Sequence, residues 1–75
     1  MTPEANFLDA LPGADIPVRN NEAVFGTGQR ICRALAGGQS EADAVKIGVD
    51  EQRWTEEQAK AAVSIAQKTM CVNGN

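Results

Sequence analysis

Two cysteines, Cys32 and Cys71, are the feature that most constrains how this chain can fold, and they are its only two. Cys32 lies inside a stretch that the sequence predicts to be helical, residues 22–36, and Cys71 directly follows another, residues 56–70. A bond between them would close a loop of about 40 residues and stabilise the fold by about 3–4 kcal/mol in the chain-entropy account. We therefore predict a disulfide that joins these two helices.

The small core explains why such a brace would matter. At 75 residues the chain is close to the size at which a hydrophobic core alone is marginal, with a total stability of about 3–5 kcal/mol. Its apolar bulk is mostly Ala and Val, and its aromatic residues are Phe7, Phe25 and Trp54. Free buried thiols and a redox-active pair remain alternatives. A catalytic pair, however, usually has Cys-x-x-Cys spacing at a helix N-terminus, where the thiolate is favoured.

The first half of the chain predicts a short helix, a connector and a longer helix. Thr2 as N-cap and Pro3 at the first helical position begin the short helix, which Pro12-Gly13 ends. Residues 13–21 form the connector. The longer helix, residues 22–36, stops at Gly37-Gly38, and its inward stripe comprises Val24, Gly28, Ile31, Cys32 and Leu35, with Phe25 beside it.

The second half predicts two more helices. Ser40 begins the third, which we expect to end near Gly48, with Ala42, Val45 and Val49 on its inward face. Before the fourth helix, Thr55 and Gln58 match a capping box, and Trp54 can pack onto Ala59. The inward face of this helix comprises Ala59, Ala62, Val63, Ala66 and Met70.

These elements predict one all-α domain over residues 1–75, an irregular orthogonal bundle of four helices with a short first helix, one disulfide and a frayed tail at 72–75. Small residues at helix crossings let backbones approach closely, and we expect Gly28 and Ala62 to serve this purpose.

Charge and hydropathy limit the kinds of partner that this chain can bind. Seven Lys and Arg are interleaved with ten Asp and Glu, giving a net charge of −3, and no basic stripe is visible. We therefore expect no nucleic-acid binding. No apolar stretch is long enough for a membrane span, and no signal peptide opens the chain. The chain is then either cytosolic or a mature secreted domain with an added Met1, and the even cysteine count favours secretion.

Chemistry that needs a metal or a cofactor is not expected. The chain has no His, and two cysteines cannot fill a four-ligand zinc site. Met70 or Cys71 could ligate haem, but a Met that ends an apolar helical face is usually part of the core. Gly26-Thr27-Gly28 lacks the strand and the Lys of a phosphate-binding loop.

The sequence also gives little indication of catalytic residues. Without His, the common Ser–His hydrolase scheme is excluded for Thr27 and Ser64. The acidic pairs Asp50-Glu51 and Glu56-Glu57 are typical of helix surfaces and helix starts. An anion site at Arg30 and Arg33 competes with the simpler interpretation of a solvated helix face. We therefore expect a protein that is not an enzyme.

The order and spacing of apolar residues, glycines and cysteines form a pattern over most of the chain: Phe7-Leu8, Leu11, Ile16-Pro17, Gly28, Ile31-Cys32, Leu35, Gly37-Gly38, an alanine-rich last helix and Cys71. This pattern resembles the actinobacterial, largely mycobacterial, domain-of-unknown-function family 732. The resemblance implies export, a structural disulfide and no established biochemical activity.

Three hypotheses follow for function. The first is a secreted or cell-envelope interaction module that binds another protein. The second is a carrier of a small apolar ligand in a cavity between helices, for which Ala and Val side chains could leave room. The third, an enzyme, would require a concave site with strongly shifted acids.

Overall fold

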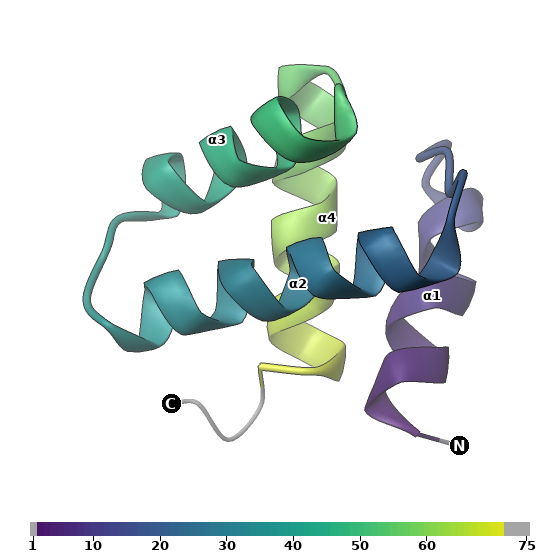
Figure 1. The fold of residues 1–75 in the computed structure, drawn as a ribbon, viewed down its shortest axis with the longest axis horizontal. Coiled ribbons are helices and arrows are strands. Elements are labelled where there is room, and N and C mark those ends of the chain that lie inside the picture. Colours follow the sequence, from purple (N-terminus) through teal and green to yellow (C-terminus); the bar gives the residue numbers. More distant parts are fainter. Residues whose placement is uncertain (1, 72–75) are drawn as a thin grey trace.

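The fold consists of four helices, seen in a computed structural model that describes residues 2–71. They are α1 (Pro3–Gly13), α2 (Asn21–Ala36), α3 (Glu41–Gln52) and α4 (Glu56–Thr69), and the described residues contain no strand (Figure 1). The predicted all-α bundle with a short first helix is confirmed. The predicted frayed tail at 72–75 lies outside the described residues.

Each helix begins with a side-chain cap that accepts a hydrogen bond from a backbone N–H of the first turn. The capping residues are Thr2, Asn20, Ser40 and Thr55. An acidic residue follows in every first turn, where it interacts favourably with the helix dipole. The helix starts are therefore set locally, by the residue types that the sequence places there.

Two helices, α2 and α4, each contact all three others. In Figure 1, α2 and α3 run side by side, α4 crosses behind α2, and α1 stands beside the first half of α2. The disulfide joins Cys32 of α2 to Cys71, just beyond α4, with the two Cα atoms 5.2 Å apart. The predicted bridge is confirmed, and it links the two helices that the others pack against.

The core draws side chains from every helix and from the connector before α2. Its members are Phe7, Leu11, Ile16, Val24, Ile31, Ala44, Val45, Trp54, Ala59, Ala62, Val63 and Ala66. Ile16 is buried because the connector presses it inward, and the carbonyl of the next residue, Pro17, accepts a hydrogen bond from Trp54 Nε1 at 3.1 Å. One aromatic residue thus fills the core and fixes the connector at the same time.

The end predicted for the third helix near Gly48 is wrong. Helix α3 continues to Gln52 and ends at Arg53, which adopts the left-handed conformation with φ 60°. Gly48 lies inside the helix and is buried. A Cβ placed there would be 3.0 Å from Trp54 Cε3 and 3.2 Å from Ala59 Cβ, so this glycine makes room for close packing instead of stopping the helix.

The inward face predicted for this helix was also partly wrong. Its buried residues are Ala44, Val45 and Gly48, whereas Ala42 is exposed and Val49 only partly buried. The face is rotated relative to the predicted stripe because Gly48 is the residue that meets Trp54. A stripe drawn through the larger apolar residues misses a contact made through a glycine.

Gly28 on α2 is a second position of close approach. A Cβ there would be 2.9 Å from both Met70 Sδ and Phe7 Cε2. The close neighbours of this glycine therefore include α1 and the residue that caps α4. Ala62, which we paired with Gly28 from the sequence, is fully buried in the core.

Candidate functional site

A polar network between α2 and α3 is centred on Thr27, whose side chain is fully buried. Its hydroxyl donates to Glu51 Oε1 at 2.8 Å and accepts from Gln52 Nε2 at 3.0 Å. Arg30, one turn along α2, donates to both carboxylate oxygens of Glu51 at 2.7 Å. The guanidinium of Arg19 donates to the Gln52 carbonyl at 3.3 Å and extends the network to the connector.

The charges of this network are matched. The Arg30 hydrogen bonds hold the pKa of Glu51 below its usual range, against the opposing effect of burial. The hydrogen bond with Glu51 raises the pKa of Arg30 in turn. The Arg30 side chain is 50% exposed and that of Glu51 31%, so solvent screens the pair and its contribution to stability is modest. The network holds α2 against α3.

Sequence reasoning did not find this network. It favoured a solvated helix face for Arg30 and Arg33 and a surface role for Asp50-Glu51, whereas the structure pairs Arg30 with Glu51. The available signal was Thr27 itself, a polar residue beside the buried stripe of α2 whose hydroxyl needed partners. Its partners lie 24 and 25 residues away, and local spacing cannot reveal them.

The predicted capping box lies at the start of α4. Thr55 accepts from the Gln58 N–H, and the Gln58 side chain accepts from the Thr55 N–H, each at 3.0 Å. The Gln58 amide also donates to the Asp15 carbonyl at 2.9 Å. The same side chain thus caps α4 and anchors the connector that leads away from α1.

A groove of about 560 Å³ runs along α1; we call it the α1 groove. Its lining includes the partly exposed apolar residues Leu8 and Val18 and the exposed acids Glu4 and Asp9. Leu8 and Val18 also pack against the core, so their positions are fixed. The groove offers apolar contact area and negative charge on a rigid support.

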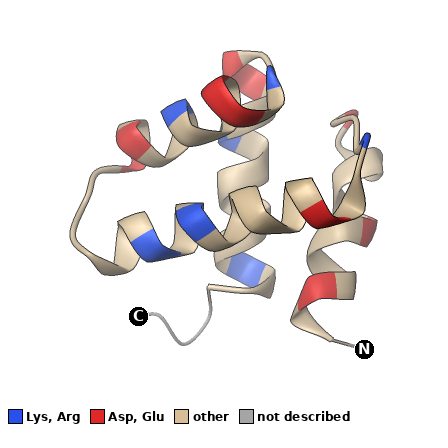
Figure 2. Cartoon of the chain, viewed as in Figure 1, with Lys and Arg blue, Asp and Glu red and all other residues tan. Residues whose placement is uncertain are grey.

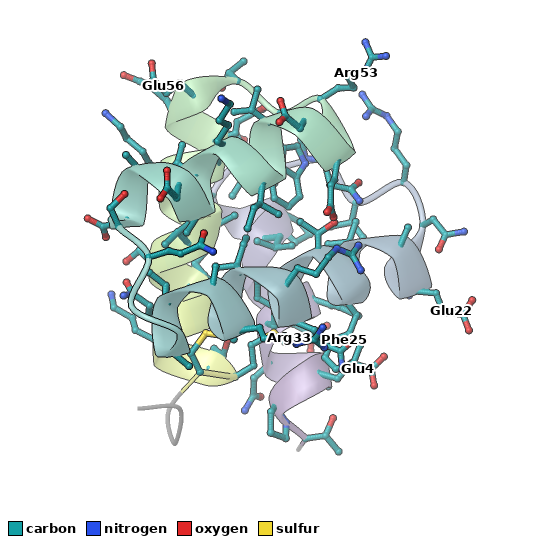
Figure 3. The ribbon with its side chains drawn as sticks, turned by 60° about the vertical axis from the view of Figure 1, so that its left-hand side comes forward. Glu4, Glu22, Phe25, Arg33, Arg53 and Glu56 are labelled. Atoms are coloured by element: carbon teal, nitrogen blue, oxygen red, sulfur yellow. A yellow bond between two sulfur atoms is a disulfide. The ribbon has the colours of Figure 1, made fainter. Side chains whose placement is uncertain are left out.

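A second groove, about 410 Å³, lies between the start of α1, helix α2 and Met70; we call it the disulfide groove because Cys32 lines it. It is lined by Pro3, Phe25, Gln29, Cys32, Arg33, Ala36 and Met70. Figure 3 shows Glu4, Phe25 and Arg33 gathered on this side of the molecule, with Arg53 and Glu56 at the opposite end. The first turn of α1 contributes to both grooves, Glu4 to the α1 groove and Pro3 to the disulfide groove, and we refer to the two grooves together as the α1 face.

The interior is filled at the two glycines of the helix crossings. At Gly28 and Gly48 even an added methyl group would meet atoms at 2.9–3.0 Å. These crossings leave no room for the ligand of an apolar carrier. Every buried side-chain nitrogen or oxygen of the described residues has a hydrogen-bond partner.

Within residues 2–71, no three Cys, Asp or Glu side chains are grouped so that they could hold a metal ion. None of the helices in this part of the chain combines the length and the apolar character that a membrane span requires.

Comparison with known proteins places the chain in a family. No curated protein and no solved structure matched the chain. One family, described as a protein of unknown function (DUF732), matches residues 3–73 and so spans all four helices and both cysteines. This chain therefore belongs to the DUF732 family.

Proposed function

We propose that this protein is a non-enzymatic interaction module that is exported to the cell envelope or the medium and binds another protein through the α1 face. The observation that carries the proposal is the set of partly exposed apolar side chains on that face, namely Leu8, Val18, Phe25 and Met70. Exposed apolar groups that surround a groove are typical of protein-binding surfaces, where Phe and Met are enriched.

The rigidity of the scaffold supports this function. The disulfide fixes Met70 and Phe25 around one groove, and Trp54 with Gln58 fixes the connector that carries Val18. A preformed surface loses little conformational entropy on binding, so that a modest contact area can give useful affinity.

The positions of the charged groups favour a non-enzymatic role. The carboxylate whose pKa is lowered, Glu51, is held by Arg30 and Thr27 in a contact between helices and lies in neither groove of the α1 face. A net charge of −3 with interleaved signs disfavours nucleic acid as the partner.

Export is supported by the disulfide, because such bonds persist in oxidising compartments and are rare in the cytosol. An actinobacterial source, which the family resemblance suggests, is part of the same proposal. Fractionation of the native host followed by intact mass measurement tests it. We expect the oxidised chain in the medium or envelope; the reduced chain in the cytosol would contradict export.

The binding function is tested by photo-crosslinking in the native host. A photoreactive phenylalanine analogue replaces Phe25 in the α1 face, and in a control protein it replaces Lys46, an exposed residue of α3. We expect a discrete protein adduct from position 25 that excess unlabelled protein suppresses. Absence of an adduct, or equal adducts from both positions, would overturn the proposal.

A further inference from the structure

We propose that the α1 groove binds a cationic amphipathic segment of the partner, with its apolar side chains on Leu8 and Val18 and its Lys or Arg residues beside Glu4 and Asp9. This inference rests on the proposed function and adds the chemistry of the partner. The groove combines negative charge with apolar surface, and a cationic amphipathic segment is complementary to both.

The charged side chains that α1 and the connector up to Val18 carry all have one sign. Residues 2–18 contain Glu4, Asp9 and Asp15 and no Lys or Arg, and Figure 2 shows no blue segment on α1. The next charged residue, Arg19, is directed toward α3, where its guanidinium donates to the Gln52 carbonyl at 3.3 Å. The nearest cation in the sequence is therefore engaged outside the groove.

Acidic and apolar side chains of α1 follow each other at a spacing of four residues along the groove. Glu4 and Leu8 are four residues apart on α1, as are Ala5 and Asp9, and all four line the groove. Residues at this spacing are neighbours on a helix surface. A facing helix with the same spacing of apolar and cationic residues would place each group against its complement.

Three other hollows of residues 2–71 each have a cation in their lining. The hollows between α3 and α4 combine Lys46 and Lys60 with Glu41, Asp50 and Glu56. The charged residue that lines the disulfide groove is the cation Arg33. Among these surfaces, the α1 groove selects a partner by charge most clearly.

The test is a titration of ¹⁵N-labelled protein with a synthetic amphipathic peptide of Leu and Lys at helical spacing, alongside a matched peptide with Glu in place of Lys. The double variant Glu4→Gln/Asp9→Asn removes the acids of the groove. The control variant Glu56→Gln/Glu57→Gln makes the same change of charge at the first turn of α4, at the opposite end of the molecule (Figure 3). The amide spectrum of each variant reports whether it is folded.

We expect the Lys peptide to shift amide resonances around residues 4–9 and 18–21, and the Glu peptide to leave them unchanged. The groove variant should bind the Lys peptide at least about threefold more weakly, and the control variant should bind as the wild type does. Equal binding of both peptides, equal loss in both variants, or shifts confined to other helices would overturn the inference. A position-25 crosslink together with any of these results would leave the proposed function standing and exclude a cationic partner at this groove.

Discussion

The hydroxyl of Thr27 donates to the carboxylate of Glu51 across 2.8 Å, inside the contact between α2 and α3. The bond is notable because Thr27 is fully buried while Glu51 reaches solvent and pairs with Arg30. It carries the polar contact from the surface of the protein into its core. Its removal should therefore cost more than the loss of one exposed hydrogen bond.

The variant Thr27→Val keeps the shape of this side chain and removes its hydroxyl. We expect a loss of about 1–3 kcal/mol in the free energy of unfolding, because the Gln52 amide loses its acceptor and Glu51 a donor. Urea unfolding followed by Trp54 fluorescence measures it. The control is Thr69→Val, whose hydroxyl donates to the Ile65 carbonyl of its own helix. An equal loss in both variants would contradict the role assigned to Thr27.

Acid should weaken the same contact. Because the folded pKa of Glu51 is lowered, its contribution to stability is present above the unfolded glutamate pKa of about 4.3 and is lost as pH falls through the lower folded pKa. The variant Glu51→Gln should be less stable than the wild type at neutral pH, and its stability should decline less on acidification. Urea midpoints at pH 7 and at about pH 3 check this. If the stability of the variant declined as steeply with acid as that of the wild type, the pKa of Glu51 would not be lowered in the folded protein.

Two glycines of α2 make a matched pair. At Gly28 an added Cβ would lie 2.9 Å from Met70 Sδ and Phe7 Cε2, so Gly28→Ala should destabilise by about 1–3 kcal/mol. At Gly26 its nearest neighbour would be the flexible end of Arg30, at 3.3 Å. Gly26→Ala should therefore be neutral or stabilising by up to about 1 kcal/mol, through helix propensity. Thermal unfolding of both variants decides, and a stabilised Gly28→Ala protein would refute the close packing.

Reduction should cost a large share of the total stability. The bridge spans 39 residues, and its loss should lower the free energy of unfolding by about 3–4 kcal/mol in the chain-entropy account. The double variant Cys32→Ser/Cys71→Ser, melted beside the wild type with and without reductant, measures this. Reductant should have no effect on the variant. A wild-type protein that melts at the same temperature in both conditions would show that the brace is dispensable.

What the sequence could predict depended on how local each feature was. The capping box of Thr55 and Gln58 was predictable because all of its residues lie within one segment of four. The disulfide was predictable because the two cysteines lie in or next to stretches with a helical pattern. The end of α3 was misplaced because Gly48 has the residue type of a stop, while its role comes from the indole of Trp54 on the far side of a turn. The Thr27 network and the α1 groove join residues that only the packed helices bring together.

The position of the disulfide also decides which single proteolytic cuts would leave the chain covalently joined. A cut in the loop of residues 37–40, or in the turn before α4, falls between Cys32 and Cys71, so both fragments would remain covalently attached. A cut in the connector of residues 14–20 lies outside that span and would leave α1 held only by the packing of Phe7 and Leu11 in the core. After a single cleavage, helices α2 to α4 thus stay covalently joined, whereas the helix that carries the acidic groove depends on noncovalent contacts alone.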